Sequence, residues 1–147
     1  MNVGEIMTRY VEFIDGDASA KEAAEMMGEL DVGALPVGTP ERIEGVVTDR
    51  DVLYRVVARG LDPLTTRVRD IASRPVVACL EEDTPQGAMD LMASHHVRRL
   101  AVRGAGGMVV GWLTLSDLSR KLLLDSDAMQ ASLRTLTDPA PASPPAV

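Results

Sequence analysis

Two short motifs in the sequence place a hydroxyl and a carboxylate directly after an apolar stretch. Thr48 and Asp51 close the segment GVVTDRD, and Thr114 and Asp117 close the segment GWLTLSD. The spacing Thr-x-x-Asp is that of a helix capping box, in which both side chains satisfy backbone amides at a helix start. A carboxylate at a strand-to-helix corner can also accept hydrogen bonds from the hydroxyls of a ribose. The two interpretations are compatible, because a capping carboxylate keeps lone pairs free.

The overall composition is that of a folded domain with a negative net charge. Hydrophobic residues make up 46% of the 147 residues and charged residues 25%, a balance typical of globular proteins. The 15 basic and 22 acidic side chains give a formal charge of −7, which disfavours binding to nucleic acids and to anionic membranes. An anionic ligand would therefore have to rely on local arginines.

Cysteine usage and hydropathy bear on the cellular compartment. Cys79 is the single cysteine of the chain and lies in the apolar stretch PVVACL, so a disulfide framework or a cysteine metal cage within the chain is excluded. No apolar run approaches the roughly 18 to 20 residues of a membrane-spanning helix. The N-terminal residues also lack a basic region followed by an apolar core. We therefore expect a cytoplasmic protein that has no membrane partner.

The chain contains the same pattern twice. A shift of 65 residues places segment 5–37 on segment 70–102 with many identical residues. After one inserted residue in the second half, a shift of 66 places the first Thr-x-x-Asp motif on the second. The two motifs thus occupy the same place in two copies of one unit.

Each copy predicts the element order β-α-β-β-α. Ser19 with Glu22, and Thr84 followed by Pro85, are start signals for the first helix of each copy. Gly60 stands where a left-handed residue would end the last helix of the first copy. The predicted elements are strands at 11–15 and 76–80, helices beginning at 20 and 85, hairpins that join 34–37 to 43–47 and 99–102 to 108–113, and helices at 49–59 and 115–124.

The repeat also suggests the domain organisation. One unit is too small to bury both faces of its sheet, so the two copies must pack against each other. The expected division is a first repeat at 1–60, a linker at 61–69, a second repeat at 70–124, and a C-terminal helix with a proline- and alanine-rich tail at 125–147.

At this level of detail the sequence resembles a known family. The first copy carries IMTRYV, GALPV and GVVTDRD, and the second carries IASRPV, RRLAV and GWLTLSD. This ordered set resembles the cystathionine-β-synthase (CBS) domain pair, also called a Bateman module, over about residues 3 to 124. The resemblance implies an α/β (α+β) fold of two tandem CBS-like repeats packed with pseudo-twofold symmetry. It also implies two clefts for adenosine-containing ligands, with AMP and ATP foremost among AMP, ADP, ATP, S-adenosylmethionine and NAD.

The resemblance further assigns roles to individual residues. The carboxylate and hydroxyl of each Thr-x-x-Asp motif would hold the ribose, and the residue opening the first strand of each unit would border the adenine. Arginines near the two helix starts would hold phosphates. The implied ligand residues are Thr48, Asp51, Thr114 and Asp117 for ribose, Val11 and Val76 for adenine, and Arg50, Arg98 and Arg99 for phosphates.

Two departures from the family pattern fall in the second copy. Ala101 stands where the family often has proline, and Leu115 with Ser116 replaces the charged pair Asp49 and Arg50 of the first copy. The second cleft is therefore expected to be less polar than the first. On that ground the first cleft is expected to bind a nucleotide at least as tightly as the second.

Among function classes, the sequence favours a regulatory nucleotide-binding module. We find no nucleophile-base set, no metalloprotease motif and no phosphate-binding loop, so we do not expect an enzyme or a required cofactor. His95 and His96 are adjacent and point apart on a helix, which makes them a poor metal pair. The alternative is a ligand-free scaffold for dimerisation or partner docking. In either case the apolar width of helix 49–59 predicts a homodimer, and the resemblance implies a regulated enzyme or transporter.

Overall fold

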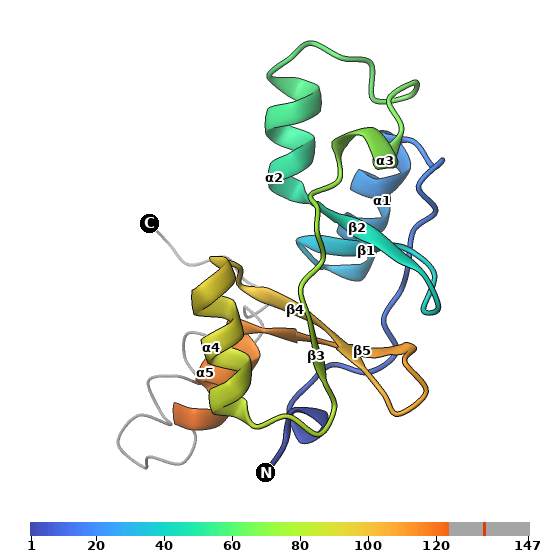
Figure 1. The fold of residues 1–147 in the computed structure, drawn as a ribbon. Helices are drawn as coiled ribbons and strands as arrows, with labels where there is room; N and C mark the ends of the chain where they lie inside the picture. The colour runs from blue at the N-terminus through green and yellow to red at the C-terminus, as the bar shows by residue number, and fades with distance from the viewer. Residues whose placement is uncertain (124–133, 135–147) are drawn as a thin grey trace.

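The structure, a computed structural model, describes residues 1–123 and Arg134, and it forms two lobes that pack against each other (Figure 1). The C-terminal helix and tail expected at 125–147 lie outside the described residues, apart from Arg134. Each lobe has its own buried core, and a third apolar cluster lies between the two sheets. The expected fold of two tandem repeats is confirmed.

The first lobe contains helices over one antiparallel hairpin. Ser19 and Glu22 form the expected capping box at the start of α1. Gly60 has φ +66°, as expected for a residue that ends the last helix in a left-handed conformation. Its elements are α1 (Ala20–Leu30), β1 (Ala34–Gly38), β2 (Ile43–Thr48), α2 (Asp49–Val52), the π-helical turn η2 (Leu53–Val57) that continues α2, and the short helix α3 (Val68–Ile71).

The second lobe repeats this order with a longer sheet. Thr84 caps α4 through the amide of Gly87, and Pro85 occupies the first helical position, as expected. Asp31 and His96 end α1 and α4 in the same left-handed conformation, with φ 55° and 54°. The elements are β3 (Ala78–Leu80), α4 (Pro85–His95), β4 (Arg99–Arg103), β5 (Val109–Thr114) and α5 (Leu115–Leu123), preceded at the N-terminus by the short helix η1 (Val3–Glu5).

The two repeats exchange their opening segments. The N-terminal residues Val3 and Met7 are buried in the core of the second lobe, and the amide of Val3 donates to the carbonyl of Asp83. Val68 and Ile71, at the start of the second repeat, are buried in the core of the first lobe. The segment predicted as a linker at 61–69 thus already contains the start of α3. Each lobe therefore includes a piece of the other repeat, which ties the lobes together.

The strand predicted at 11–15 is wrong in length, and the reason is one proline. In the second lobe, the amide of Ala101 donates to the carbonyl of Val77 and extends the parallel pairing of β3 with β4. The matching position in the first lobe is Pro36, which has no amide hydrogen to donate. Only Ile14 remains paired there, through a single bridge to Val37. The family-like proline therefore shortens the first sheet to two strands.

The third apolar cluster lies where the two sheets meet. Trp112 on β5 is 9% exposed and belongs to this cluster with Ala101 and Val109. Partly buried side chains from both lobes pack against it, among them Val11, Val46 and Val76. Short antiparallel bridges flank the cluster, joining Thr8 to Trp112 in one case and Val46 to Ser73 in the other. These bridges bring the opening segments to the edges of the sheets, beside the Thr-x-x-Asp corners.

Two further sequence expectations concern Cys79 and the membrane. Cys79 is 3% exposed, and this burial raises the pKa of its thiol to about 11, as fits an inert core residue. No helix in the described part of the chain is long and apolar enough to cross a bilayer.

Candidate functional site

Two clefts lie between the lobes, one on either side of Trp112. Cleft A has a volume of about 570 Å³ and is lined by Thr48 and Arg50 of the first repeat and by Val76 of the second. Cleft B has a volume of about 410 Å³ and is lined by Thr114 and Asp117 of the second repeat and by Val11 of the first. Both volumes are in the range of small-molecule sites. Each cleft thus combines the Thr-x-x-Asp corner of one repeat with the opening segment of the other.

This crossed pairing follows from the exchange of opening segments. Thr8 and Ser73 are related by the 65-residue shift, and each pairs with an edge strand of the opposite lobe's sheet. The sequence indicated the motifs and the opening valines separately, but it gave no sign of which valine faces which motif. The structure places Val11 with Asp117, and Val76 with Thr48.

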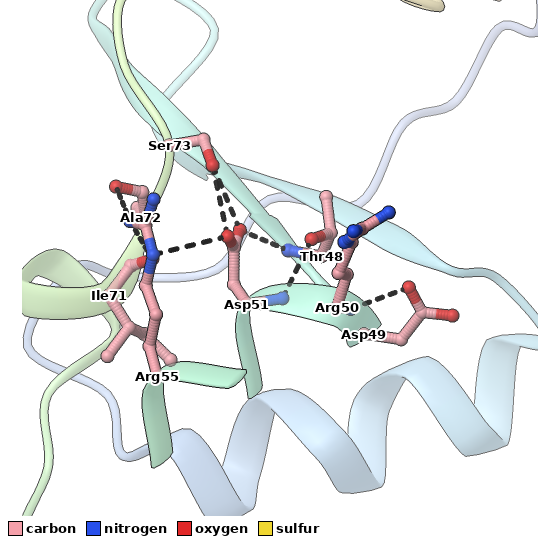
Figure 2. A network of polar contacts seen from close by, with 8 residues as sticks. All are labelled: Thr48, Asp49, Arg50, Asp51, Arg55, Ile71, Ala72 and Ser73. Atoms are coloured by element: carbon pink, nitrogen blue, oxygen red, sulfur yellow. Dashed lines mark hydrogen bonds and ion pairs between the residues drawn. The ribbon is translucent and has the colours of Figure 1, made fainter. Parts of the chain in front are cut away.

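At the first corner, both carboxylate oxygens of Asp51 are engaged within the protein (Figure 2). Oδ2 accepts from the Thr48 amide at 2.9 Å, and the Thr48 hydroxyl accepts from the Asp51 amide at 3.0 Å, so the expected capping box is present. The Ser73 hydroxyl lies 3.0 Å from Oδ1 and 3.2 Å from Oδ2. Arg55 Nε lies 3.7 Å from Oδ1. The Asp51 side chain is 8% exposed and is not among the residues that line cleft A.

The arginine at this corner also connects two chain segments. Arg55 Nη1 donates to the carbonyls of Ile71 and Ala72 at 2.9 and 3.3 Å, while Nε faces Asp51 (Figure 2). The corner therefore fastens α3, and the turn after it, to the start of α2. In this arrangement the carboxylate of Asp51 serves the packing of the first lobe.

The second corner has the same cap but a different environment for its carboxylate. Asp117 Oδ2 accepts from the Thr114 amide at 3.0 Å, and the Thr114 hydroxyl accepts from the Asp117 amide at 3.1 Å. Within the part of the chain that the structure describes, Oδ1 of Asp117 receives no hydrogen bond and no ion pair. Asp117 is half-buried and lines cleft B. One carboxylate oxygen is therefore available to a ligand.

The difference between the corners comes from two substitutions between the repeats. The position that matches Arg55 is Lys121, which is exposed and lacks the planar guanidinium that can face a carboxylate and two carbonyls together. The position that matches Ser73 is Thr8, whose main chain pairs with Trp112. Neither side chain engages Asp117 among the described residues. The capping interpretation holds at both corners, but only the second carboxylate remains open to the cleft.

The three candidate phosphate arginines are distributed unevenly. Arg50 lines cleft A, and its guanidinium lies 5.1 Å from the centroid of the Tyr54 ring. Arg98 lines cleft A and a third pocket, of about 500 Å³, at the start of α5. Arg99 lines both clefts and the α5 pocket. As expected, cleft A is richer in charged residues.

Sequence reasoning missed or underweighted several residues of these sites. Tyr10 lines cleft B, with 96% of its surface exposed and φ 59°. No pattern in the sequence predicted this position. Trp112 packs in the apolar cluster between the sheets and also lines both clefts. Ser73 could have been found from the repeat, because it aligns with Thr8 beside the opening valine.

The two histidines lie next to each other at the end of α4. Both side chains, those of His95 and His96, are exposed to solvent. Within the described residues there is no group of three histidine, cysteine, aspartate or glutamate side chains placed to hold a metal ion.

Comparisons with known proteins agree with this architecture. The family model described as "CBS domain" matches residues 3–58 and 68–124. Hypoxic response protein 1 of Mycobacterium tuberculosis is 33% identical over 119 residues, which cover 80% of this chain and 82% of that protein. A protein with CBS domains from Burkholderia ambifaria has a TM-score of 0.78 at 26% identity, covering 86% of this chain and 97% of that chain. A CBS domain protein from Pyrobaculum aerophilum, solved in complex with AMP, has a TM-score of 0.70 at 29% identity, covering 92% and 99%.

Proposed function

The chain belongs to the CBS domain family, and from that premise we propose that it is a regulatory module whose cleft B binds an adenosine nucleotide. The observation that carries the proposal is the carboxylate of Asp117, which lines the cleft with one oxygen uncommitted. A charged acceptor that receives hydrogen bonds from two ribose hydroxyls contributes roughly 1.5 to 3 kcal/mol. The AMP complex of the relative from Pyrobaculum aerophilum supports the choice of ligand class.

The remaining parts of an adenosine monophosphate have matching surfaces near Asp117. Val11, Val32 and Leu35 give the cleft an apolar wall on which a purine can lie. Arg99 lies between cleft B and the α5 pocket, which also presents Ser116 and the amides that open α5. A phosphate there would meet a guanidinium and a helix start together. Adenine, ribose and phosphate would thus lie in a row from Val11 to Ser116.

This proposal reverses the order of the two clefts expected from the sequence. The charged pair Asp49 and Arg50 suggested that cleft A binds at least as tightly. In cleft A, however, a ribose would have to compete with Ser73 and Arg55 for a carboxylate that is 8% exposed. Cleft B is less polar, but its carboxylate is accessible, so we assign it the tighter adenosine site.

The proposed role is to sense a nucleotide and to modulate a partner protein. The described residues offer no arrangement of nucleophile, base and oxyanion donors in either cleft, so the inferred function is binding without catalysis. A ligand in cleft B would contact both lobes and would therefore favour one arrangement of the lobes over others. A partner, whether an enzyme or a transporter, could respond to that arrangement.

We further propose that the module acts as a homodimer. Leu53, Tyr54 and Val57 lie on η2 with exposed fractions of 54%, 53% and 64%. Three large side chains together on one helix face form an apolar patch typical of a protein interface. Light scattering should give twice the mass of the 15.7 kDa monomer. A monomer at micromolar concentration would contradict the proposal.

Calorimetry with AMP tests the nucleotide site. The Asp117→Asn variant keeps an acceptor for the Thr114 amide but loses the charge, so AMP affinity should fall about ten- to a hundredfold. Asp51→Asn is the matched control at the first corner and should leave the tighter site nearly unchanged. The 2′-deoxy analogue of AMP should bind the native chain more weakly for the same reason.

The alternative function, a ligand-free scaffold, predicts a different result. If Asp117→Asn folds normally and binds AMP as the native chain does, the carboxylate is only a helix cap. A thermal-shift screen of AMP, ADP, ATP, S-adenosylmethionine and NAD then decides whether any adenosine ligand binds, since a ligand at 100 times its Kd stabilises by about 2.7 kcal/mol. No stabilisation by any of them would favour the scaffold.

A further inference from the structure

A single arginine lies where the two clefts meet. Arg99 opens β4, is half-buried, and lines cleft A, cleft B and the α5 pocket. The 65-residue shift maps it onto Ala34, so the first repeat supplies no matching guanidinium. Arg98 maps onto Gly33 in the same way. The two-fold pattern of the repeats is therefore broken at this place, and one cation serves both sides.

The surroundings of Arg99 leave its guanidinium free for a ligand. Among the described residues the Arg99 guanidinium takes part in no hydrogen bond and no ion pair. Arg99 Nη2 lies 3.8 Å, and Asp49 Oδ2 lies 3.3 Å, from the position that a Cβ on Gly33 would take. A larger side chain at residue 33 would therefore crowd this space. The carboxylate of Asp49 also lines cleft A and faces any anion that enters there.

We propose that Arg99 is one phosphate-binding residue shared by the two clefts, so that phosphorylated nucleotides in cleft A and cleft B oppose each other's binding. The proposal rests on the proposed nucleotide site in cleft B and extends it to the coupling between the clefts. A guanidinium holds one phosphate well through paired, parallel hydrogen bonds. A second phosphate in the other cleft would lack this partner.

The coupling depends on the charge of the ligand and not on its base. Adenosine carries no phosphate, so it needs no share of Arg99 and should occupy the two clefts independently. AMP should fill one cleft readily and the other with a penalty. Couplings between sites in proteins usually amount to about 5- to 150-fold in affinity, and we expect a value of at least about fivefold here. The module would then respond differently to a nucleoside and to its phosphate.

Blocking cleft B measures the coupling. A Val11→Trp substitution places a large side chain at the apolar end of cleft B, and Val11 itself does not line cleft A. Calorimetry with AMP then reports cleft A alone. Its affinity should be at least about fivefold tighter than that of the weaker AMP site in the native chain. With adenosine as the probe, the blocked chain and the weaker native site should agree.

Two arginine variants assign the effect to Arg99. Arg99→Gln is added both to the Val11→Trp chain and to the native chain. It should abolish the difference in AMP affinity between the blocked chain and the weaker site of the unblocked chain. Arg98→Gln is the matched control, because Arg98 lines cleft A and the α5 pocket but not cleft B, and the difference should persist. Should Val11→Trp fail to fold, the ratio of the two stepwise AMP constants in the otherwise native chain, compared with the ratio for adenosine, gives the same quantity. Arg99→Gln should bring the AMP ratio to the adenosine ratio.

Two outcomes would overturn the shared arginine, and a third would support it. Equal AMP affinity of the blocked chain and the weaker native site would show independent clefts. A blocked chain that binds no AMP would show that cleft A takes no phosphorylated nucleotide. If the native chain binds a single AMP and the blocked chain binds one AMP in cleft A, then AMP in one cleft excludes AMP from the other, which supports the proposal in its strongest form. Failure of the cleft B site itself is read separately, from Asp117→Asn in the unblocked chain.

Discussion

The two Thr-x-x-Asp corners have the same cap and different carboxylates. Both aspartates accept the amide of their threonine at about 3 Å, with 2.9 Å at the first corner and 3.0 Å at the second. Asp51 is then enclosed by Ser73 and Arg55, whereas Asp117 keeps one oxygen toward cleft B. The same motif therefore holds the fold together in one repeat and faces a ligand cleft in the other. A duplicated motif need not have a duplicated function, because the residues around it decide which lone pairs are free.

The largest expected contrast between the corners is in stability. Asp51→Ala removes the cap and also leaves Ser73 and Arg55 without their acceptor, so the free energy of unfolding should fall by about 3 kcal/mol. Asp117→Ala removes only a cap and should cost about 1 kcal/mol. Urea denaturation followed by linear extrapolation measures both values. Equal losses at the two positions would mean that the network around Asp51 adds nothing beyond the cap.

The comparison also shows which features the sequence could predict. Periodicity, caps and the repeat were sufficient for α1, α2, α4 and α5, for both hairpins and for the position of each Thr-x-x-Asp corner, because these features depend on neighbouring residues, but they did not predict the short helices η1 and α3. The crossed pairing of Val11 with Asp117 could not be predicted, since it follows from long-range exchange of the opening segments. The free oxygen of Asp117 could not be predicted from the sequence either. It depends on Lys121 and Thr8, which lie far apart in the sequence.

One departure in the sequence had a consequence that only the structure made visible. Ala101 was noted as a replacement for a family proline and was used to describe the second cleft. Its physical effect is on the sheet, because its amide reaches the carbonyl of Val77 at 3.0 Å. Pro36 cannot make the matching bond, so the strand predicted at 11–15 is reduced to a single bridge at Ile14. A residue that departs from a family pattern can thus act through a backbone hydrogen bond that the pattern does not describe.

A second and smaller contrast concerns the hydroxyls beside the two carboxylates. The Ser73 hydroxyl donates to Asp51, so Ser73→Ala should lower the free energy of unfolding by about 1 kcal/mol. Thr8 is the matched position and is exposed, and Thr8→Ala should change stability by no more than about 0.5 kcal/mol. Both values come from urea denaturation. A loss at Thr8 as large as that at Ser73 would indicate that the second carboxylate is also held by a hydroxyl.

The smallest effect is expected from making the second corner resemble the first. Lys121→Arg places a guanidinium four residues after Asp117, as Arg55 stands after Asp51, where it can pair with the carboxylate and reach the carbonyls of the N-terminal segment. The ion pair would be partly exposed and hence weak, so AMP affinity in cleft B should fall only about two- to fivefold.

Lys121→Gln is the control for this change, because it removes the lysine charge without supplying a fork of donors. Calorimetry with AMP should then show a larger loss for the arginine variant than for the glutamine variant. If both variants lose affinity equally, the effect comes from the missing lysine and not from a newly occupied carboxylate. The free oxygen of Asp117 would then have some other cause than the absence of an arginine at residue 121, and the explanation of the two corners by that one substitution would fail.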